Sequence, residues 1–175
     1  MKITYRPATQ ADITSLPAIE HSAGQRFRDL PALAWLADSP GISVEQHQLF
    51  AEQEMSWVAL ADGQPVGFVL ADAHALSLFI VELSVHLEWQ GKGIGRQLLA
   101  CVAEKARMQK RASLTLTTFR DVPWNAPFYM RLGFAMVSDE ELPAELRQKR
   151  EEETAHGLTY GSRCAMRLML TSRPA

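Results

Sequence analysis

Apolar residues recur along the chain with two different periods, and these predict alternating helices and strands. From Ile94 onward they recur at helical spacing, and cations gather toward the C-terminal end of that stretch, which predicts an amphipathic helix. Residues 76–85 are almost continuously apolar, as expected for a strand that is covered on both faces. We therefore expect this strand to be central in a sheet and the fold to be of the mixed α/β class.

Capping and turn residues mark the remaining elements. Thr9 is followed three positions later by Asp12, and this capping-box spacing predicts a helix start near residue 10. Pro17 would lie beyond the first turn of that helix and would bend it. Ser43 is followed by Gln46 at the same spacing, which predicts a second helix start. Further strands are expected over 3–6, 57–61, 66–71, 113–119, 134–137 and 164–170, and further helical segments over 126–132 and 139–156.

An ordinary globular composition changes this picture little. With 175 residues the chain has the size of one domain, so we expect a single domain over residues 1–175. The net charge is -2 and the cations are scattered, which argues against a nucleic-acid partner. No apolar run approaches the length of a membrane span, and the N-terminus lacks a signal-peptide core. We therefore expect a cytoplasmic protein that does not associate with a membrane.

The spacing of cysteine and histidine residues offers no local motif for a metal or a nucleophile. Cys101 and Cys164 lie far apart without a nearby histidine, and we interpret both as reduced packing residues. The five histidines show no metal-binding spacing. No metal ion is therefore expected.

Three glycines at alternate positions stand between the apolar strand and the helix that follows it. Gly91, Gly93 and Gly95 would let backbone amides approach an anion, and the helix start adds a partial positive charge. The turn therefore predicts a phosphate cradle. A P-loop is disfavoured because its G-x-x-x-x-G-K-[ST] pattern is absent, and the dinucleotide pattern G-x-G-x-x-G fails at Arg96. A tight turn without a ligand is the structural alternative.

Two motifs, in chain order, resemble those of the GNAT superfamily of N-acetyltransferases. Gln90-x-x-Gly93-x-Gly95 resembles the coenzyme-A signature of that family, and residues 128–134 resemble its F-Y-x-x-x-G-F segment. The order of elements is similar over essentially the whole chain, although specific motifs lie only within residues 79–134. The resemblance implies a GNAT fold, with a mixed central sheet of about six or seven strands flanked by helices, and acetyl-CoA as co-substrate.

By the same resemblance, the strand end would pair with the pantetheine arm of the coenzyme, and the turn would hold its pyrophosphate. These roles belong mostly to the main chain. The residues implied are Leu83, Ser84, Val85, Gln90, Gly91, Lys92, Gly93, Ile94, Gly95 and Arg96. Asn125 is a further candidate for the pantetheine arm, but many family members carry their asparagine at the position of Val122. A helix cap is an equally good interpretation of Asn125.

Acetyl transfer to an amine needs a neutral nucleophile and a thiolate that can leave. Glu82 interrupts the apolar strand, where a lone carboxylate is costly unless it is paired or opens into a cleft, and it is the candidate base. A bond to a neighbouring strand would make it structural instead, and His86 is the second candidate. Tyr129 matches the family tyrosine near the coenzyme sulfur, which implies that it stabilises the leaving thiolate. Its structural alternative is a packing aromatic.

The acceptor is expected to be a small-molecule primary amine that attacks the thioester directly. This preference depends on Phe27 and Trp35, which the resemblance places in the wall of the acceptor site and which could equally form a core patch. It also depends on Pro127-Phe128-Tyr129, which is similar to the matching segment of arylalkylamine acetyltransferases. The alternatives are a protein N-terminal or lysine acetyltransferase and a non-catalytic acyl-CoA-binding domain. The resemblance allows a homodimer.

Overall fold

The structure is a computed structural model that describes residues 2–170, and its strands form one sheet. The seven strands are β1 (Ile3–Pro7), β2 (Ser56–Ala61), β3 (Gln64–Ala73), β4 (Ser77–Val85), β5 (Ser113–Phe119), β6 (Ala135–Val137) and β7 (Arg163–Met169). They are ordered β1-β2-β3-β4-β5-β7-β6 in the sheet. β4 and β5 pair in parallel, whereas β1 with β2, β2 with β3, and β7 with both β5 and β6 pair antiparallel. The predicted mixed sheet is therefore confirmed.

Helices occupy the connections between the strands. The α-helices are α1 (Gln10–Ile13), α2 (Leu16–Gly24), α3 (Val44–Glu52), α4 (Ile94–Met108), α5 (Ala126–Arg131) and α6 (Ala144–Ala155). The 3-10 helices are η1 (Gln25–Asp29), η2 (Pro31–Asp38), η3 (Leu87–Trp89), η4 (Asp139–Glu141) and η5 (Tyr160–Ser162). Contacts divide the chain into two compact units, of which unit 1 comprises Met1–Ala71 and Val81–Val102, and unit 2 comprises Asp72–Ile80 and Ala103–Ala175. The prediction of a single domain stays a prediction.

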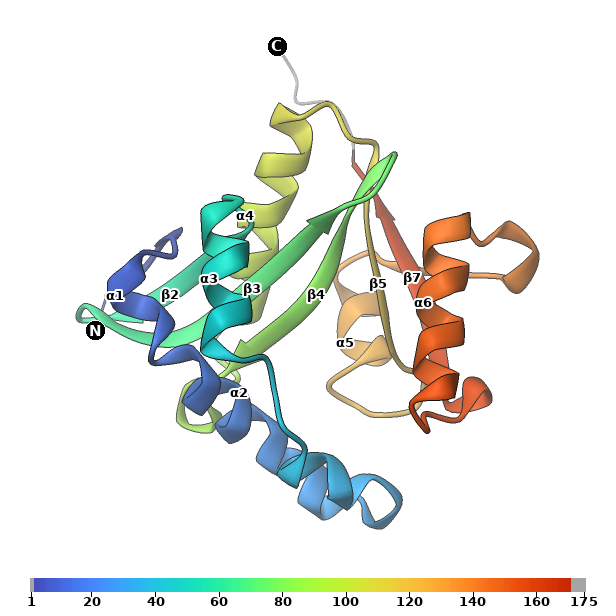
Figure 1. The fold of residues 1–175 in the computed structure, drawn as a ribbon, viewed down its shortest axis with the longest axis horizontal. Helices are drawn as coiled ribbons and strands as arrows, with labels where there is room; N and C mark the ends of the chain where they lie inside the picture. The colour runs from blue at the N-terminus through green and yellow to red at the C-terminus, as the bar shows by residue number, and fades with distance from the viewer. Residues whose placement is uncertain (1, 171–175) are drawn as a thin grey trace. The chain divides into compact units, whose positions relative to one another are not determined.

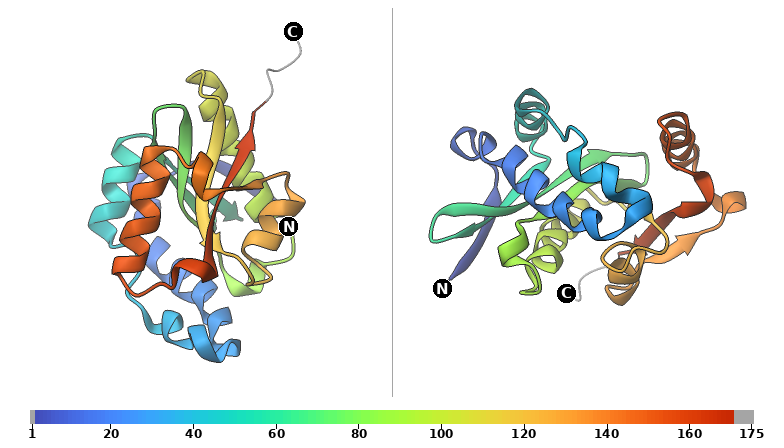
Figure 2. Two further views of the ribbon diagram at one scale, coloured as in Figure 1. Left: turned by 90° about the vertical axis from the view of Figure 1, so that its right-hand side faces the viewer. Right: turned by 90° about the horizontal axis from the view of Figure 1, so that it is seen from below.

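Unit 1 is built on an apolar core beneath its N-terminal helices. Helices α1, α2 and α3 cover one face of β1, β2 and β3, and the beginning of α4 lies on the other face (Figures 1 and 2). The core cluster comprises Leu16, Ile19, Val58, Leu60, Phe68 and Leu70. His47 of α3 is fully buried, and its ring meets that of Phe68 edge-on at 5.0 Å between centroids. Burial lowers the pKa of His47 from 6.5 to about 4, so this ring is neutral in the folded protein at pH 7.

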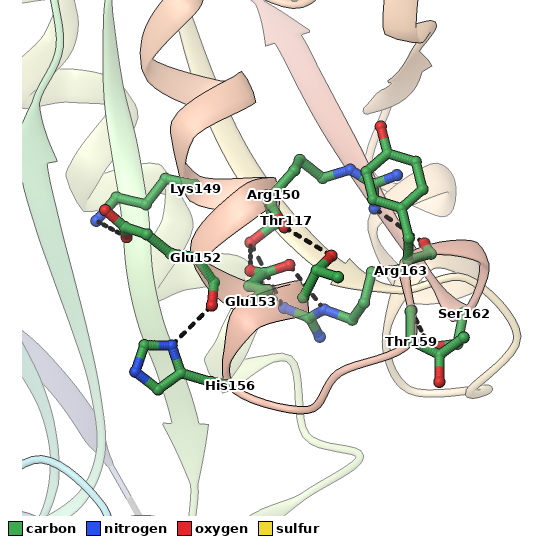
Figure 3. Close-up of polar contacts among 11 residues, drawn as sticks. Thr117, Lys149, Arg150, Glu152, Glu153, His156, Thr159, Ser162 and Arg163 are labelled. Atoms are coloured by element: carbon green, nitrogen blue, oxygen red, sulfur yellow. Dashed lines mark hydrogen bonds and ion pairs between the residues drawn. The ribbon is translucent and has the colours of Figure 1, made fainter.

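In unit 2, helix α6 covers β5 and β7 through polar contacts. Figure 3 shows Glu153 of α6 between Thr117 of β5 and Arg163 of β7, with hydrogen bonds to both. The guanidinium of Arg163 also lies over the Phe119 ring, 4.4 Å from its centroid. Burying such charged groups is tolerable because each is paired and hydrogen-bonded. Helix α5 lies on the opposite face of the unit 2 strands from α6 (Figure 2).

The sequence patterns predicted most elements, with one error at Pro17. The Ser43 hydroxyl accepts a hydrogen bond from the Gln46 amide at 3.1 Å, which confirms the predicted cap of α3. Pro17, however, does not bend the first helix. α1 ends at Ile13 and α2 begins at Leu16, so the proline occupies the second position of a new helix, where its missing N–H costs nothing.

Candidate functional site

The glycine turn has an open backbone that leaves room for a ligand. Gly91 and Gly93 adopt φ values of +77° and +81°, in the left-handed region that glycine occupies readily. A Cβ atom placed on either residue would meet no other atom within 4 Å. Both glycines are also exposed. The surroundings therefore do not require glycine for packing, and the turn is open where the predicted phosphate cradle should be.

The first amides of α4 complete this cradle. The first hydrogen bond of α4 runs from the Gln97 amide to the Gly93 carbonyl, at 3.2 Å. The helix amides that precede Gln97 have no acceptor within the helix. Lys92 and Arg96 are exposed on the same turn and add two positive charges. Backbone amides, a helix dipole and flanking cations are a suitable set for phosphate oxygens. The turn therefore fits the pyrophosphate implied by the resemblance.

The end of β4 leaves backbone groups for an extended ligand. The parallel ladder between β4 and β5 comprises three residue pairs and ends at Phe79 and Thr115. Leu83, Ser84 and Val85 lie beyond that ladder, so their backbone groups on that edge are not used by it. A pantetheine arm, which carries amide groups, could hydrogen-bond along this edge in the manner of an added strand. A coenzyme-binding role for this edge stays a prediction.

Gly67 of β3 is a residue of this region that the sequence reasoning missed. A Cβ atom there would lie 3.2 Å from the Ser84 carbonyl oxygen and 3.3 Å from the Ile94 side chain. Both distances are tighter than usual contacts, so a side chain would push β3 away from the strand end and from the start of α4. The signal in the sequence was a lone glycine inside an otherwise apolar strand, which often marks a close backbone approach.

Glu82 is partly buried, and its carboxylate has a partner on its own strand. The Ser84 hydroxyl donates to Glu82 Oε1 at 3.1 Å, across the two-residue spacing that places both side chains on one face of β4. The Ser84 side chain therefore helps to orient the carboxylate. His86, the second candidate, accepts a hydrogen bond from the Glu88 amide at 3.2 Å and so caps η3.

The F-Y-x-x-x-G-F segment of unit 2 folds as α5 with a Schellman end. Gly133 has φ +100°, and the amides of Gly133 and Phe134 donate to the carbonyls of Met130 and Tyr129 at 3.0 and 3.1 Å. The Phe134 ring packs against the Tyr129 ring, 5.5 Å between centroids, which is the apolar contact that usually accompanies this motif. The spacing of the segment thus holds the buried ring of Tyr129 in place.

Asn125 precedes α5 but does not cap it with its side chain. The carbonyl of Asn125 accepts from the Tyr129 amide at 3.1 Å, and the Asn125 amide donates to the Val122 carbonyl at 2.9 Å. The side chain makes no capping hydrogen bond. The structure therefore does not support the capping alternative, and a coenzyme-binding role for Asn125 stays a prediction.

Phe27 and Trp35 lie in an arm formed by η1 and η2, residues 25–38. Gln25 Nε2 donates to the Ala37 carbonyl at 3.1 Å, and the Arg28 guanidinium meets Asp38 at 2.6 Å, so the two ends of the arm are tied together. Phe27 is half-buried, whereas 51% of Trp35 is exposed. The core-patch alternative therefore does not hold for Trp35.

The predicted site residues are divided between the two units. Unit 1 contains the glycine turn, Leu83 to Val85, Glu82 and the arm, whereas Tyr129 and Asn125 belong to unit 2. Among the described residues there is no group of three or more His, Cys, Asp or Glu side chains that could hold a metal ion. Cys101 and Cys164 are free thiols, and burial raises the pKa of both. No helix within residues 2–170 has the length and apolar character needed to cross a membrane.

Comparison with known proteins finds a family model that matches the middle of the chain. Residues 52–136, which include β4, the glycine turn, α4 and α5, match the family model described as an acetyltransferase (GNAT) domain. The fold predicted from the two motifs is the one observed, and the match contains both motifs. Residues 52–136 of the chain therefore match a GNAT acetyltransferase domain, and the whole described fold is similar to that of GNAT N-acetyltransferases.

Solved structures of similar fold include enzymes with different acceptors. PaiA N-acetyltransferase from Thermoplasma acidophilum, in complex with coenzyme A, is 17% identical, with a TM-score of 0.72 over 97% of this chain and 100% of that one. N-acetylglutamate synthase from Neisseria gonorrhoeae, with coenzyme A and N-acetyl-glutamate, is 19% identical, with a TM-score of 0.72 over 98% of this chain and 36% of that one. The ribosomal-protein-S18-alanine N-acetyltransferase from Escherichia coli is 16% identical, with a TM-score of 0.67 over 99% and 97%. These similarities describe the fold and leave the acceptor open.

Proposed function

We propose that this chain is an acetyl-CoA-dependent N-acetyltransferase that moves the acetyl group to the primary amine of a small molecule. The observation that carries the proposal is the open turn at Gly91 and Gly93, which precedes α4 within the residues that match the acetyltransferase domain. When bound, acetyl-CoA supplies the thioester that the amine attacks. Lys92, Arg96 and the amides at the start of α4 would hold its pyrophosphate, and the edge of β4 over Leu83, Ser84 and Val85 would hold its pantetheine arm.

Glu82 is the residue proposed to prepare the amine. An alkylamine with a pKa of about 10.4 is mostly protonated at pH 7, and neutralising it costs roughly 4 to 5 kcal/mol. Glu82 would draw the ammonium group into the site and accept its proton, directly or through water. Ser84 supports this role because its hydroxyl holds Glu82 Oε1 at 3.1 Å and thereby fixes the carboxylate.

Tyr129 is the residue proposed to act on the leaving sulfur. Its hydroxyl would donate a hydrogen bond from Oη to the sulfur as negative charge develops there. A thiol of pKa near 8.5 is a stronger acid than a tyrosine of about 10, so complete proton transfer from Oη would be uphill by about 2 kcal/mol. Hydrogen-bond stabilisation is therefore the main contribution expected of Tyr129.

The arm favours an acceptor with an apolar body. Trp35 and the half-buried Phe27 give it aromatic surface, and the ties of Gln25 and Arg28 hold that surface in one shape. A protein N-terminus is the second candidate, because one protein of similar fold acetylates the alanine of a ribosomal protein and another is bound to a peptide. The aromatic surface of residues 25–38 leads us to prefer a small molecule as the acceptor.

The test of the acceptor class is release of free thiol from acetyl-CoA across a mixed panel. The panel contains aromatic and aliphatic small amines, polyamines, peptides with free N-termini and peptides with internal lysine. We expect the highest kcat/KM with an amine on an apolar or aromatic body. A peptide acceptor that exceeds all small amines by tenfold or more would overturn the small-molecule assignment. No release with any amine would overturn the catalytic assignment.

A further inference from the structure

The short connection between β4 and the glycine turn sets how two parts of the proposed site lie relative to each other. β4 ends at Val85, η3 occupies Leu87–Trp89, and the turn begins at Gln90. In the proposed function the strand end holds the pantetheine arm and the turn holds the pyrophosphate. Because the strand end and the turn bind two portions of the same ligand, the affinity for that ligand depends on a fixed spacing between the strand end and the turn.

Gln90 holds this connection closed with its side chain. Its Nε2 donates to the Val85 carbonyl at 2.8 Å, in a partly buried position. The bond joins the last residue of β4 to the first residue of the turn and encloses η3. The carboxamide of Gln90 is thus directed at the protein backbone, although the resemblance assigns this residue to the coenzyme.

Ser22, which lies outside the connection, forms a hydrogen bond with it. The Leu87 amide, the first of η3, donates to the Ser22 hydroxyl oxygen at 3.0 Å. Ser22 belongs to α2 and lies 65 residues earlier in the chain. The connection is therefore fixed at Val85 by Gln90 and at Leu87 by Ser22, and both bonds lie within unit 1.

We propose that Gln90 and Ser22 are positioning residues that brace the β4–η3 connection, so that the strand end and the phosphate cradle fit one coenzyme molecule together. This inference rests on the proposed function. It assigns the Gln90 side chain to the Val85 carbonyl instead of the pyrophosphate, and it gives α2 a part in coenzyme binding. Loss of either hydrogen bond should weaken a ligand that spans both parts more than a ligand that occupies the cradle alone.

The experiment compares two probes on matched variants. Gln90→Met keeps the length of the side chain and removes its donor, and Ser22→Ala removes the hydroxyl. Gln53→Met and Ser138→Ala are the controls, because both residues are exposed and lie outside the connection. Affinities for coenzyme A, which spans both parts, and for 3′-phosphoadenosine 5′-diphosphate, which reaches only the cradle, are measured by calorimetry, together with the melting temperature of each ligand-free variant.

We expect the Kd for coenzyme A to rise about 5- to 10-fold in Gln90→Met and about 2- to 5-fold in Ser22→Ala, whose bond is more exposed. The Kd for 3′-phosphoadenosine 5′-diphosphate should stay within twofold of that of the natural protein. Equal losses for both probes would mean that Gln90 contacts phosphate directly, and unchanged affinity for both would mean that no brace exists; either result overturns the inference. Failure of the natural protein to bind coenzyme A would instead overturn the proposed function.

Discussion

The two units of the chain carry their candidate functional groups in opposite ways. In unit 1 the glycine turn is proposed to bind through backbone amides, and the absence of side chains at Gly91 and Gly93 leaves it open. In unit 2 the proposed functional group is one hydroxyl, at the end of the buried Tyr129 side chain. Adding atoms should therefore damage the turn of unit 1, whereas removing atoms should damage α5 of unit 2. The F-Y-x-x-x-G-F spacing serves this second purpose, because Gly133 ends the helix and Phe134 holds the ring.

The units also differ in how a helix is joined to the sheet. Helix α3 of unit 1 buries a neutral histidine against Phe68, beside an apolar cluster. In unit 2, Glu153 of helix α6 and Arg163 of β7 form a largely buried, hydrogen-bonded ion pair (Figure 3). The apolar contact of α3 does not depend on a charged partner. The buried ion pair of α6 and β7 is stabilising only while both charged side chains are present. The units should therefore respond differently to substitution and to acid.

The largest effect is expected at Glu82. It is the candidate functional side chain of unit 1, whereas the glycine turn of that unit is proposed to bind through its backbone. Glu82→Gln keeps the shape of the residue, so coenzyme binding should hold while kcat/KM for the amine falls by 10²- to 10⁴-fold if Glu82 is a general base. Activity should recover partly at high pH, because solvent then supplies the neutral amine. Glu45→Gln, in the first turn of α3, is the control. Activity close to that of the natural protein at pH 7 would assign Glu82 to structure.

The next effect concerns the buried pair of unit 2. The side chains of Arg163 and Glu153 are only 13% and 18% exposed, so Glu153→Ala leaves a largely buried guanidinium without its carboxylate. We expect the free energy of unfolding to fall by about 2 to 4 kcal/mol, against less than about 0.5 kcal/mol for Glu152→Ala on the exposed side of α6. Urea unfolding measures both. Equal effects in the two variants would show that the pair does not hold α6.

Acid should affect unit 1 through His47. Its pKa in the folded protein, about 4, lies below the ordinary 6.5, so the unfolded chain takes up a proton first as the pH falls. The stability linked to His47 is complete above pH 6.5 and is lost between pH 6.5 and 4, on the order of 2 to 3 kcal/mol. His47→Leu should remove this part of the pH dependence. Identical pH profiles for His47→Leu and the natural protein would contradict the burial argument.

The smallest effect is expected at Tyr129. Tyr129→Phe keeps the ring that packs on Phe134 and removes only the hydroxyl, so coenzyme affinity should hold while turnover falls about 10- to 100-fold, the value of one hydrogen bond to a charged group. Tyr160→Phe removes a hydroxyl that is bonded to Asp139 and serves as the control in the same unit. Undiminished turnover with a rate-limiting chemical step would leave Tyr129 as a packing residue.

Local patterns predicted local structure well. The strand over 113–119 was predicted with its observed bounds, and the hairpin between β2 and β3 follows from Asp62-Gly63, which both adopt positive φ. The error at Pro17 arose because the sequence does not show that the helix restarts at Leu16, which makes the proline an early residue instead of an interior one.

Contacts between residues far apart in the chain could not be predicted from the sequence. Nothing in the pattern around Ser22 indicates that its hydroxyl accepts from Leu87, 65 residues later. The hydrogen bond between Ser84 and Glu82 joins residues only two positions apart, yet predicting it required the geometry of β4. The motif identified Gln90, but the direction of its side chain toward Val85 depends on how η3 folds between them.

The central claim, that the open glycine turn binds acetyl-CoA, is tested most directly by thermal melting with saturating acetyl-CoA. Gly93→Glu places a negatively charged side chain in the turn, and Gly63→Glu is its matched control, because Gly63 also has a positive φ, +83°, and open space around its Cβ position. At about 100 times the Kd, the ligand should stabilise the natural protein and Gly63→Glu by roughly 2.7 kcal/mol and leave Gly93→Glu unchanged. An unchanged melting curve for the natural protein, or an undiminished shift in Gly93→Glu, would contradict the account.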